Sequence, residues 1–159
     1  MPDSNSINIL FNYFSDILDD YATEILVAEV VNEEYGYYKL KSLPFYAPKI
    51  ALDDIVWAEY KDTEGMLVYR KTVQHSGNST LHVVILKDEY PFDTIAVVFE
   101  ANGCITEKLN DKFFAIAIPV SVDYLSVKSR LDQLENEKIL DYAESWLSEK
   151  HQYKKVQFQ

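Results

Sequence analysis

The chain has 159 residues, 48% of them apolar, which is enough to bury the core of one sizeable domain or of two smaller units. Its 26 acidic and 15 basic residues give a formal net charge of −11, which repels phosphate backbones and anionic lipid and argues against a nucleic-acid or membrane-surface role. No apolar run reaches the roughly 20 residues that span a bilayer, and the first residues lack the pattern of a signal peptide, so we expect a soluble, cytoplasmic protein.

The acidic residues gather in the N-terminal part of the chain. No Lys or Arg precedes Lys39, whereas eight acids do: Asp3, Asp16, Asp19, Asp20, Glu24, Glu29, Glu33 and Glu34. Many of the twelve tyrosines lie in the same half, and tyrosine offers a large, rigid contact area with a hydroxyl group. This composition suits binding to a basic protein, or it only maintains solubility.

The first expected element is an amphipathic helix over residues 7–20. Asn5 or Ser6 can serve as its N-cap. Apolar residues recur at helical spacing, namely Ile7, Leu10, Phe11, Phe14, Ile17 and Leu18. We expect this apolar stripe to pack on the core of the protein or on a partner.

The next part of the chain, residues 20–76, is typical of a small antiparallel β-barrel or a curled sheet. Short β-branched or alternating runs predict strands at residues 25–31, 37–41, 55–61 and 66–75. Pro44 and Pro48 stiffen the segment between the second and third of these strands, because proline fixes φ and lacks an N–H group.

Residues 77–147 alternate in the order βαββαβ, which predicts a ferredoxin-like subdomain. Pro91 marks the start of its first helix, and Asp123 can cap the second. The expected fold class is therefore α+β, with an N-terminal tail and helix over residues 1–19, a barrel-like subdomain, a ferredoxin-like subdomain and a loose, polar tail over residues 148–159.

Four blocks of the chain resemble a bacterial family catalogued only as a domain of unknown function. The blocks are Leu-Pro-Phe-Tyr-Ala at 43–47, Asp-Asp-Ile-Val-Trp-Ala-Glu at 53–59, Ser-Gly-Asn-Ser-Thr at 76–80 and Leu-Asp-Tyr at 140–142. The resemblance covers about residues 22–147, with His82 standing where many members have arginine. It implies a short, acidic bacterial protein of the kind that often serves as the immunity partner of a secreted toxin, and it implies no catalytic residues.

The candidate catalytic and metal-binding residues favour structural roles. His75, Ser76 and the Asp53–Asp54 pair could be a base, a nucleophile and orienting carboxylates, but Ser76 stands in a Gly-Asn turn between two strands. Adjacent aspartates entering a strand point to opposite faces, so they do not readily bind one cation. Cys104 is the one cysteine and suits a buried, inert thiol. We expect no enzyme, no metal and no cofactor.

Our first functional hypothesis is an immunity protein that binds and neutralises a cognate toxin domain, a basic nuclease, through an acidic, tyrosine-rich surface. The residues expected to contact the toxin are Asp16, Asp19, Asp20, Glu33, Glu34, Tyr35 and Tyr37. The alternative is a small-ligand-binding or regulatory module with a pocket between the two subdomains near Trp57 and His82. A hydrolase that uses His75 and Ser76 is a third possibility.

Overall fold

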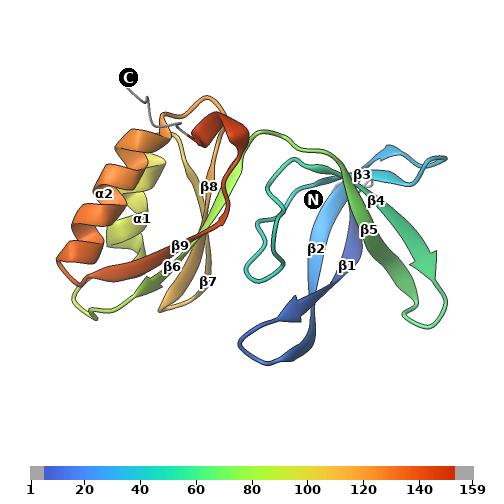
Figure 1. The fold of residues 1–159 in the computed structure, drawn as a ribbon, viewed down its shortest axis with the longest axis horizontal. Coiled ribbons are helices and arrows are strands. Elements are labelled where there is room, and N and C mark those ends of the chain that lie inside the picture. The colour runs from blue at the N-terminus through green and yellow to red at the C-terminus, as the bar shows by residue number, and fades with distance from the viewer. Residues whose placement is uncertain (1–5, 153–159) are drawn as a thin grey trace, which may run out of the picture. The chain divides into compact units, whose positions relative to one another are not determined.

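Five consecutive strands of the computed structural model, which describes residues 6–152, close into a barrel (Figure 1). They are β1 (Ser6–Ser15), β2 (Asp20–Asn32), β3 (Tyr37–Leu40), β4 (Ile55–Lys61) and β5 (Met66–Gln74). Strands that are neighbours in sequence pair antiparallel, and β1 closes the barrel by pairing in parallel with β5. The barrel lies in the first of two compact units, residues 1–76 and 77–159.

The barrel interior is filled by alternate residues of its strands, as the two-residue period of a strand requires. Ile9 and Phe11 of β1 are buried, and the Phe11 ring stacks on Tyr69 of β5 with 4.5 Å between ring centroids. The buried cluster is completed from β2, β3, β4 and the segment after β3 by Leu26, Ala28, Tyr38, Leu40, Ala47, Ile50, Val56 and Ala58.

The helix expected over residues 7–20 is wrong, because these residues form β1, the turn after it and the first residue of β2. Ile7 and Phe11 are four residues apart, a spacing that fits one helical turn and also two strand repeats. Ile9 and Tyr13 complete the strand pattern, and both belong to the barrel core or pack against it. Asn5, one of the two expected N-caps, lies outside the described residues, and Ser6 is the first residue of β1.

Two carboxylates hold the segment between β3 and β4 in place. Glu24 of β2 accepts hydrogen bonds from the backbone N–H groups of residues 45, 46 and 47 at 2.8, 3.1 and 2.8 Å. Asp54 is fully buried and accepts hydrogen bonds from the N–H groups of Ala51 at 3.0 Å and Ser76 at 2.8 Å. The ends of the segment also make backbone hydrogen bonds to strands, from Lys41 N–H to the Val27 carbonyl oxygen and from Asp53 N–H to the Leu40 carbonyl oxygen. In its interior, the two carboxylates satisfy backbone donors that have no strand to bind.

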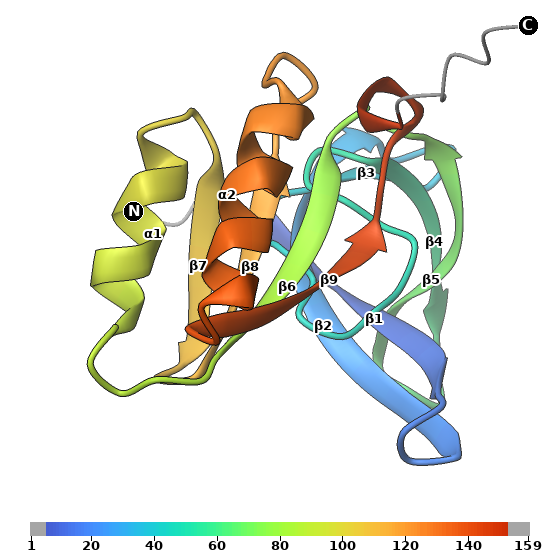
Figure 2. The same ribbon diagram turned by 60° about the vertical axis from the view of Figure 1, so that its left-hand side comes forward.

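The second unit is a four-stranded sheet covered on one face by two helices (Figures 1 and 2). Its elements are β6 (Ser79–Ile85), α1 (Phe92–Glu100), β7 (Ile105–Asn110), β8 (Phe113–Ile118), α2 (Tyr124–Asn136) and β9 (Leu140–Trp146). The sheet order is β7-β8-β6-β9, and every neighbouring pair is antiparallel. As expected, Asp123 caps α2, where its side chain accepts a hydrogen bond from the Leu125 N–H group.

The C-terminal segment expected to be loose begins with buried residues. Glu149–His151 form a short 3-10 helix, and both Ser148 and His151 are buried. His151 Nδ1 lies 2.6 Å from Ser79 Oγ, and His151 Nε2 lies 3.1 Å from the Pro119 carbonyl oxygen. Because a carbonyl oxygen only accepts, Nε2 carries a proton and donates it to Pro119, and in a neutral ring Nδ1 then accepts from the Ser79 hydroxyl group. Residues 153–159 lie outside the described part of the chain.

The expected fold class is wrong and is corrected as follows. Of the described residues, 47% lie in strands and 17% in helices, so the chain is mostly β rather than α+β. It consists of a closed five-stranded barrel and a second sheet with two helices. This description replaces both the N-terminal helix and the ferredoxin-like βαββαβ subdomain.

We predict that Asp54→Asn destabilises the protein by roughly 1–3 kcal/mol, because an amide has one oxygen where the carboxylate accepts two backbone N–H groups. The control is Asp53→Asn, whose side chain is 41% exposed and whose positive φ of 68° asparagine tolerates. Chemical denaturation should show a loss of stability for the first variant and little change for the second. Equal losses would contradict the role given to Asp54.

Candidate protein-binding site

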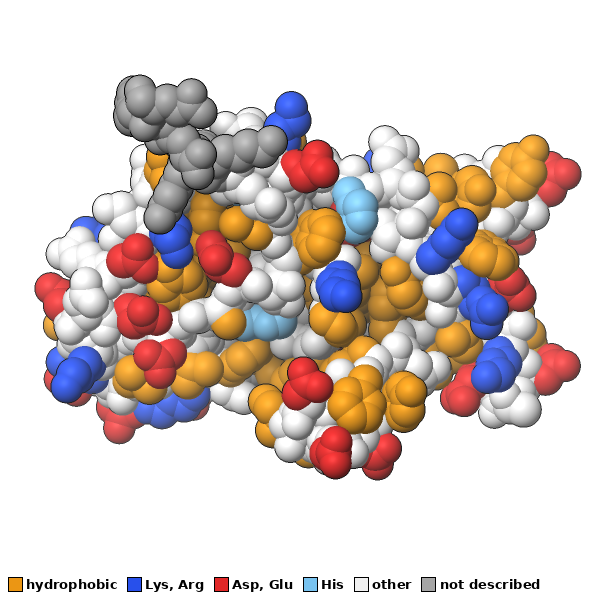
Figure 3. All heavy atoms as spheres, in the orientation of Figure 1, with side chains coloured by type: hydrophobic (Ala, Val, Ile, Leu, Met, Phe, Trp, Pro, Cys, Tyr) orange, Lys and Arg blue, Asp and Glu red, His pale blue; other side chains and the backbone are white. Residues whose placement is uncertain are grey.

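The turn between β1 and β2 exposes large apolar side chains that sequence reasoning assigned to a helix. Ile17 is 96% exposed and Leu18 67%, and in the strands on either side Phe14, Tyr21 and Ile25 are exposed as well. A folded protein exposes single apolar residues routinely, but a contiguous group of them marks an interaction site. We call residues 14–21, which include all of these side chains except Ile25, the hairpin tip. In Figure 3 it lies at the lower middle, where hydrophobic side chains adjoin acidic ones.

The hairpin tip is ordered by local contacts. The Leu18 N–H group donates to Ser15 Oγ at 3.3 Å, and the Tyr21 N–H group donates to Asp20 Oδ1 at 2.7 Å. The rings of Phe14 and Tyr21 meet edge to face with 5.5 Å between their centroids. Because a partner would find these side chains already positioned, less conformational entropy would be lost on binding.

The charge of the hairpin tip is negative. Asp16, Asp19 and Asp20 all lie in it, and β1 and β2 contain no Lys or Arg to neutralise them. Asp19 adopts a positive φ of 51°, a conformation that aspartate accepts more readily than most residues. The tip therefore combines an apolar centre with a carboxylate rim, which fits an apolar surface bordered by Lys and Arg on another protein.

The seven residues expected to contact a partner do not form one surface. Asp16, Asp19 and Asp20 lie before or at the start of β2, whereas Glu33, Glu34, Tyr35 and Tyr37 lie beyond its end. Because β2 has 13 residues and a strand rises about 3.3 Å per residue, the two groups are separated by about 40 Å along the strand. A standard interface covers about 800 Å² on each partner. A patch of that area is narrower than the distance between the two groups along β2, so one standard interface does not include both.

The residues expected to line a ligand pocket belong to different units. Trp57 lies in β4, where it is partly exposed and has the Arg70 guanidinium 5.8 Å from its ring centroid. His82 lies in β6, with its ring centroid 5.5 Å from that of Phe113. The pocket expected near these two residues stays a prediction.

The candidate catalytic residues lie close together but do not form a nucleophile–base pair. Asp54 Oδ2 is 3.4 Å from His75 Nδ1, as an orienting carboxylate would be. The Ser76 hydroxyl group, however, donates to the Leu52 carbonyl oxygen at 2.8 Å. A nucleophilic serine donates its hydroxyl proton to the base, whereas the Ser76 proton is directed at the loop carbonyl of Leu52.

A polar cluster that sequence reasoning did not identify joins α2 to β9. Lys128 Nζ donates to Tyr142 Oη at 2.8 Å, Tyr142 in turn donates to Asp132, and the Tyr124 hydroxyl group donates to Glu144. The hydrogen bond to Tyr142 raises the pKa of Lys128, with a further contribution from Glu144. Burial and the bond to Glu144 raise the pKa of the Tyr124 phenol. These residues are bound to one another, which favours a role in fixing α2 on the sheet.

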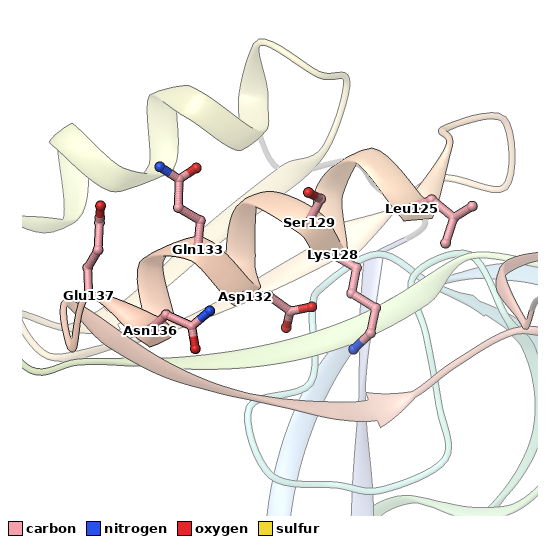
Figure 4. Close-up of a pocket in the computed structure, with 7 residues that line it drawn as sticks. All are labelled: Leu125, Lys128, Ser129, Asp132, Gln133, Asn136 and Glu137. Atoms are coloured by element: carbon pink, nitrogen blue, oxygen red, sulfur yellow. The ribbon is translucent and has the colours of Figure 1, made fainter.

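A hollow of about 700 Å³ lies along α2 beside this cluster. Figure 4 shows its lining residues projecting from α2 or the turn after it in diverging directions, rather than converging on an enclosed space: Leu125, Lys128, Ser129, Asp132, Gln133, Asn136 and Glu137. Small-molecule sites are concave and largely apolar, with a few converging polar groups. The hollow therefore fits a ligand site poorly.

Within residues 6–152, no three His, Cys, Asp or Glu side chains are placed to hold a metal ion. Among the helices of that range, none is both long enough and apolar enough to cross a membrane.

Two comparisons with known proteins found a similarity that covers most of the chain. A family model described as Domain of unknown function (DUF4265) matches residues 24–142. The structure of a hypothetical protein from Neisseria gonorrhoeae is similar, with a TM-score of 0.76 and 28% sequence identity, over 89% of this chain and 94% of that chain. The comparison with curated proteins gave no match.

We predict that Cys104 reacts with thiol reagents only when the chain unfolds. Burial raises the pKa of this thiol to about 11, from an ordinary value of 9.0, so little thiolate forms at pH 8. Because the unfolded chain ionises first, the contribution of the thiol to stability is complete below pH 9 and decreases toward pH 11.

Modification by Ellman's reagent with and without denaturant measures this protection. In denaturation curves between pH 9 and 11, Cys104→Ala should lose less stability than the parent chain. Rapid modification of the folded protein at pH 8 would contradict the buried environment of Cys104.

Proposed function

We propose that this chain, which belongs to the DUF4265 family, is a protein-binding module that captures a basic partner protein with its hairpin tip. The observation that carries the proposal is the exposed apolar centre of the tip, Ile17 and Leu18, rimmed by three aspartates. The match bears out the coarser expectation, a family of unknown function. It does not test the four sequence blocks or the immunity role, and it carries no activity with it.

Burial energetics support a binding role for the tip. Covering a fully exposed Leu or Ile side chain contributes about 1.5–3 kcal/mol, and Ile17 is 96% and Leu18 67% exposed, so their burial would offset part of the cost of association. The aspartates would act differently, because charges at the rim of an interface mainly raise the association rate. The apolar centre would thus mainly set the dissociation rate, and the acidic rim would mainly set the association rate.

The narrower form of the proposal is an immunity protein that acts in the cytoplasm on a cognate toxin domain, a basic nuclease. The acidic charge and the family resemblance motivate it, and the comparisons add no support for it. A basic nuclease has the complementary charge, and covering its substrate surface would neutralise it.

The competing hypothesis is a ligand-binding module with a site at Trp57 or His82. Such a protein would gain thermal stability on adding a metabolite and would keep its function when the hairpin tip is altered. The hollow along α2 includes neither of these two residues. A protein-binding module would gain no thermal stability from a metabolite and would lose its function when the hairpin tip is altered.

We predict that Asp16→Asn, Asp19→Asn and Asp20→Asn together lower the association rate about ten-fold at low salt and flatten its salt dependence. The binding partner to use is the C-terminal domain of the protein encoded immediately upstream, with surface plasmon resonance as the measurement. The matched control is Glu33→Gln with Glu34→Gln, which removes charge at the other end of β2.

A second variant tests the apolar centre. Ile17→Ser with Leu18→Ser should raise the dissociation rate at least about ten-fold while leaving the association rate nearly unchanged. If the upstream domain does not bind, the immunity form is wrong. If it binds and both sets of variants behave like the parent chain, the hairpin tip is not the site.

A further inference from the structure

A row of aromatic side chains crosses the barrel surface at the end of β2 away from the hairpin tip. We call Tyr35, Tyr37 and Trp57 the aromatic row. Tyr37 of β3 and Trp57 of β4 are directly paired across the strands, which places both side chains on the same face. Their neighbours Tyr38 and Val56 are buried in the barrel, so the row lies on the outer face.

The rings of the row are accessible and closely spaced. Tyr35 is 63% exposed, and its ring centroid lies 5.7 Å from that of Tyr37 with 32° between the ring planes. Tyr37 and Trp57 are partly exposed. The row therefore presents the Tyr35 ring and part of the Tyr37 and Trp57 side chains to solvent.

The turn that carries Tyr35 is held rigidly against β4. Gly36 has a φ of +74°, and a Cβ atom at this position would approach the Ala58 carbonyl oxygen to 2.9 Å and the Trp57 ring to 3.2 Å. The Ala58 N–H group donates to the Gly36 carbonyl oxygen at 3.0 Å, and the Tyr35 N–H group donates to Asn32 Oδ1 at 3.1 Å. A binding surface that is ordered beforehand loses less entropy when a ligand arrives.

The two ends of the row carry opposite charges. Glu33 and Glu34 precede Tyr35 in the turn, while the Arg70 guanidinium lies 5.8 Å from the centroid of the Trp57 ring. Lys71 pairs with Trp57 in the register between β4 and β5. A peptide lying along the row would therefore be oriented, with a basic residue at the glutamate end.

We propose that the aromatic row binds an extended, proline-rich segment that carries a basic residue at one end. Aromatic surfaces bind polyproline II helices, which pay little entropy because they are already extended. The three-fold repeat of such a helix brings every third residue to the same face, so one face can lie along the aromatic row while a terminal basic residue reaches the glutamates. Single-stranded nucleic acid also stacks on aromatic rows, but the two glutamates and the net charge of −11 oppose its phosphates. This inference does not rest on the function proposed for the hairpin tip.

The test uses the full chain labelled with ¹⁵N and two synthetic peptides, Arg-Arg-octaproline and Glu-Glu-octaproline. The arginine peptide should shift the amide signals of residues 35–37 and the Trp57 indole signal, and it should bind more tightly than the glutamate peptide. Tyr35→Ala should weaken binding about five-fold, since one aromatic contact is lost. Tyr21→Ala, which removes another exposed tyrosine, 75% exposed on the hairpin tip, is the matched control and should leave affinity unchanged.

Four outcomes would overturn the inference. They are the absence of shifts at millimolar peptide, equal effects of the two tyrosine variants, equal binding of the two peptides, and tighter binding of oligothymidine at the same signals. The triple aspartate variant of the hairpin tip should bind the arginine peptide like the parent chain. A failure here therefore leaves the function proposed for the tip unaffected, and the reverse also holds.

Discussion

The architecture of the first unit depends on one short contact, the parallel pairing of β1 with β5 at Ile9–Leu67 and Leu10–Val68. An odd number of strands that follow one another antiparallel can close only through a parallel pair, and closure removes the sheet edges that would otherwise invite aggregation. Since β5 pairs with β1 only here, and β3 reaches only the far part of β2, residues 12–23 pair solely with each other. They continue beyond the barrel as a two-stranded ribbon, and this ribbon presents the hairpin tip.

How much of the fold could be predicted from the sequence depended on the spacing of apolar residues in each segment, because some spacings fit a strand alone and others fit a helix as well. The barrel strands after β1 were predictable because β-branched and alternating runs have no helical counterpart. In β1 the pairs Ile7–Phe11 and Leu10–Phe14 fit helix and strand equally, and the exposed Ile17 and Leu18 extended the helical pattern beyond the strand. Local periodicity does not reveal that an apolar side chain is left in solvent, so the N-terminal helix was a wrong prediction and the fold class failed with it.

The candidate site was predictable in composition but not in arrangement. The acidic character of residues 16–20 and 33–34 is evident from the sequence, whereas their separation follows from the length of β2. Glu24 looked like one more surface acid, yet it accepts three backbone N–H groups from a segment about twenty residues further along the chain. His151 and Ser79 gave no signal at all, because their hydrogen bond joins positions 72 residues apart. Such contacts depend on tertiary structure, which no local pattern encodes.

The strand that closes the barrel, β5, comes last in the sequence of the barrel, and this order affects the chain during its synthesis. The ribosome synthesises β1 and β2 before β5. During that interval the core residues Ile9 and Phe11 are not yet covered by β5. A nascent hairpin of this kind is prone to pair with other chains. Asp16, Asp19 and Asp20 place negative charge at its turn during that interval, and like charges on two nascent chains would repel each other there. The carboxylates that would attract a basic protein would thus also oppose self-association during synthesis.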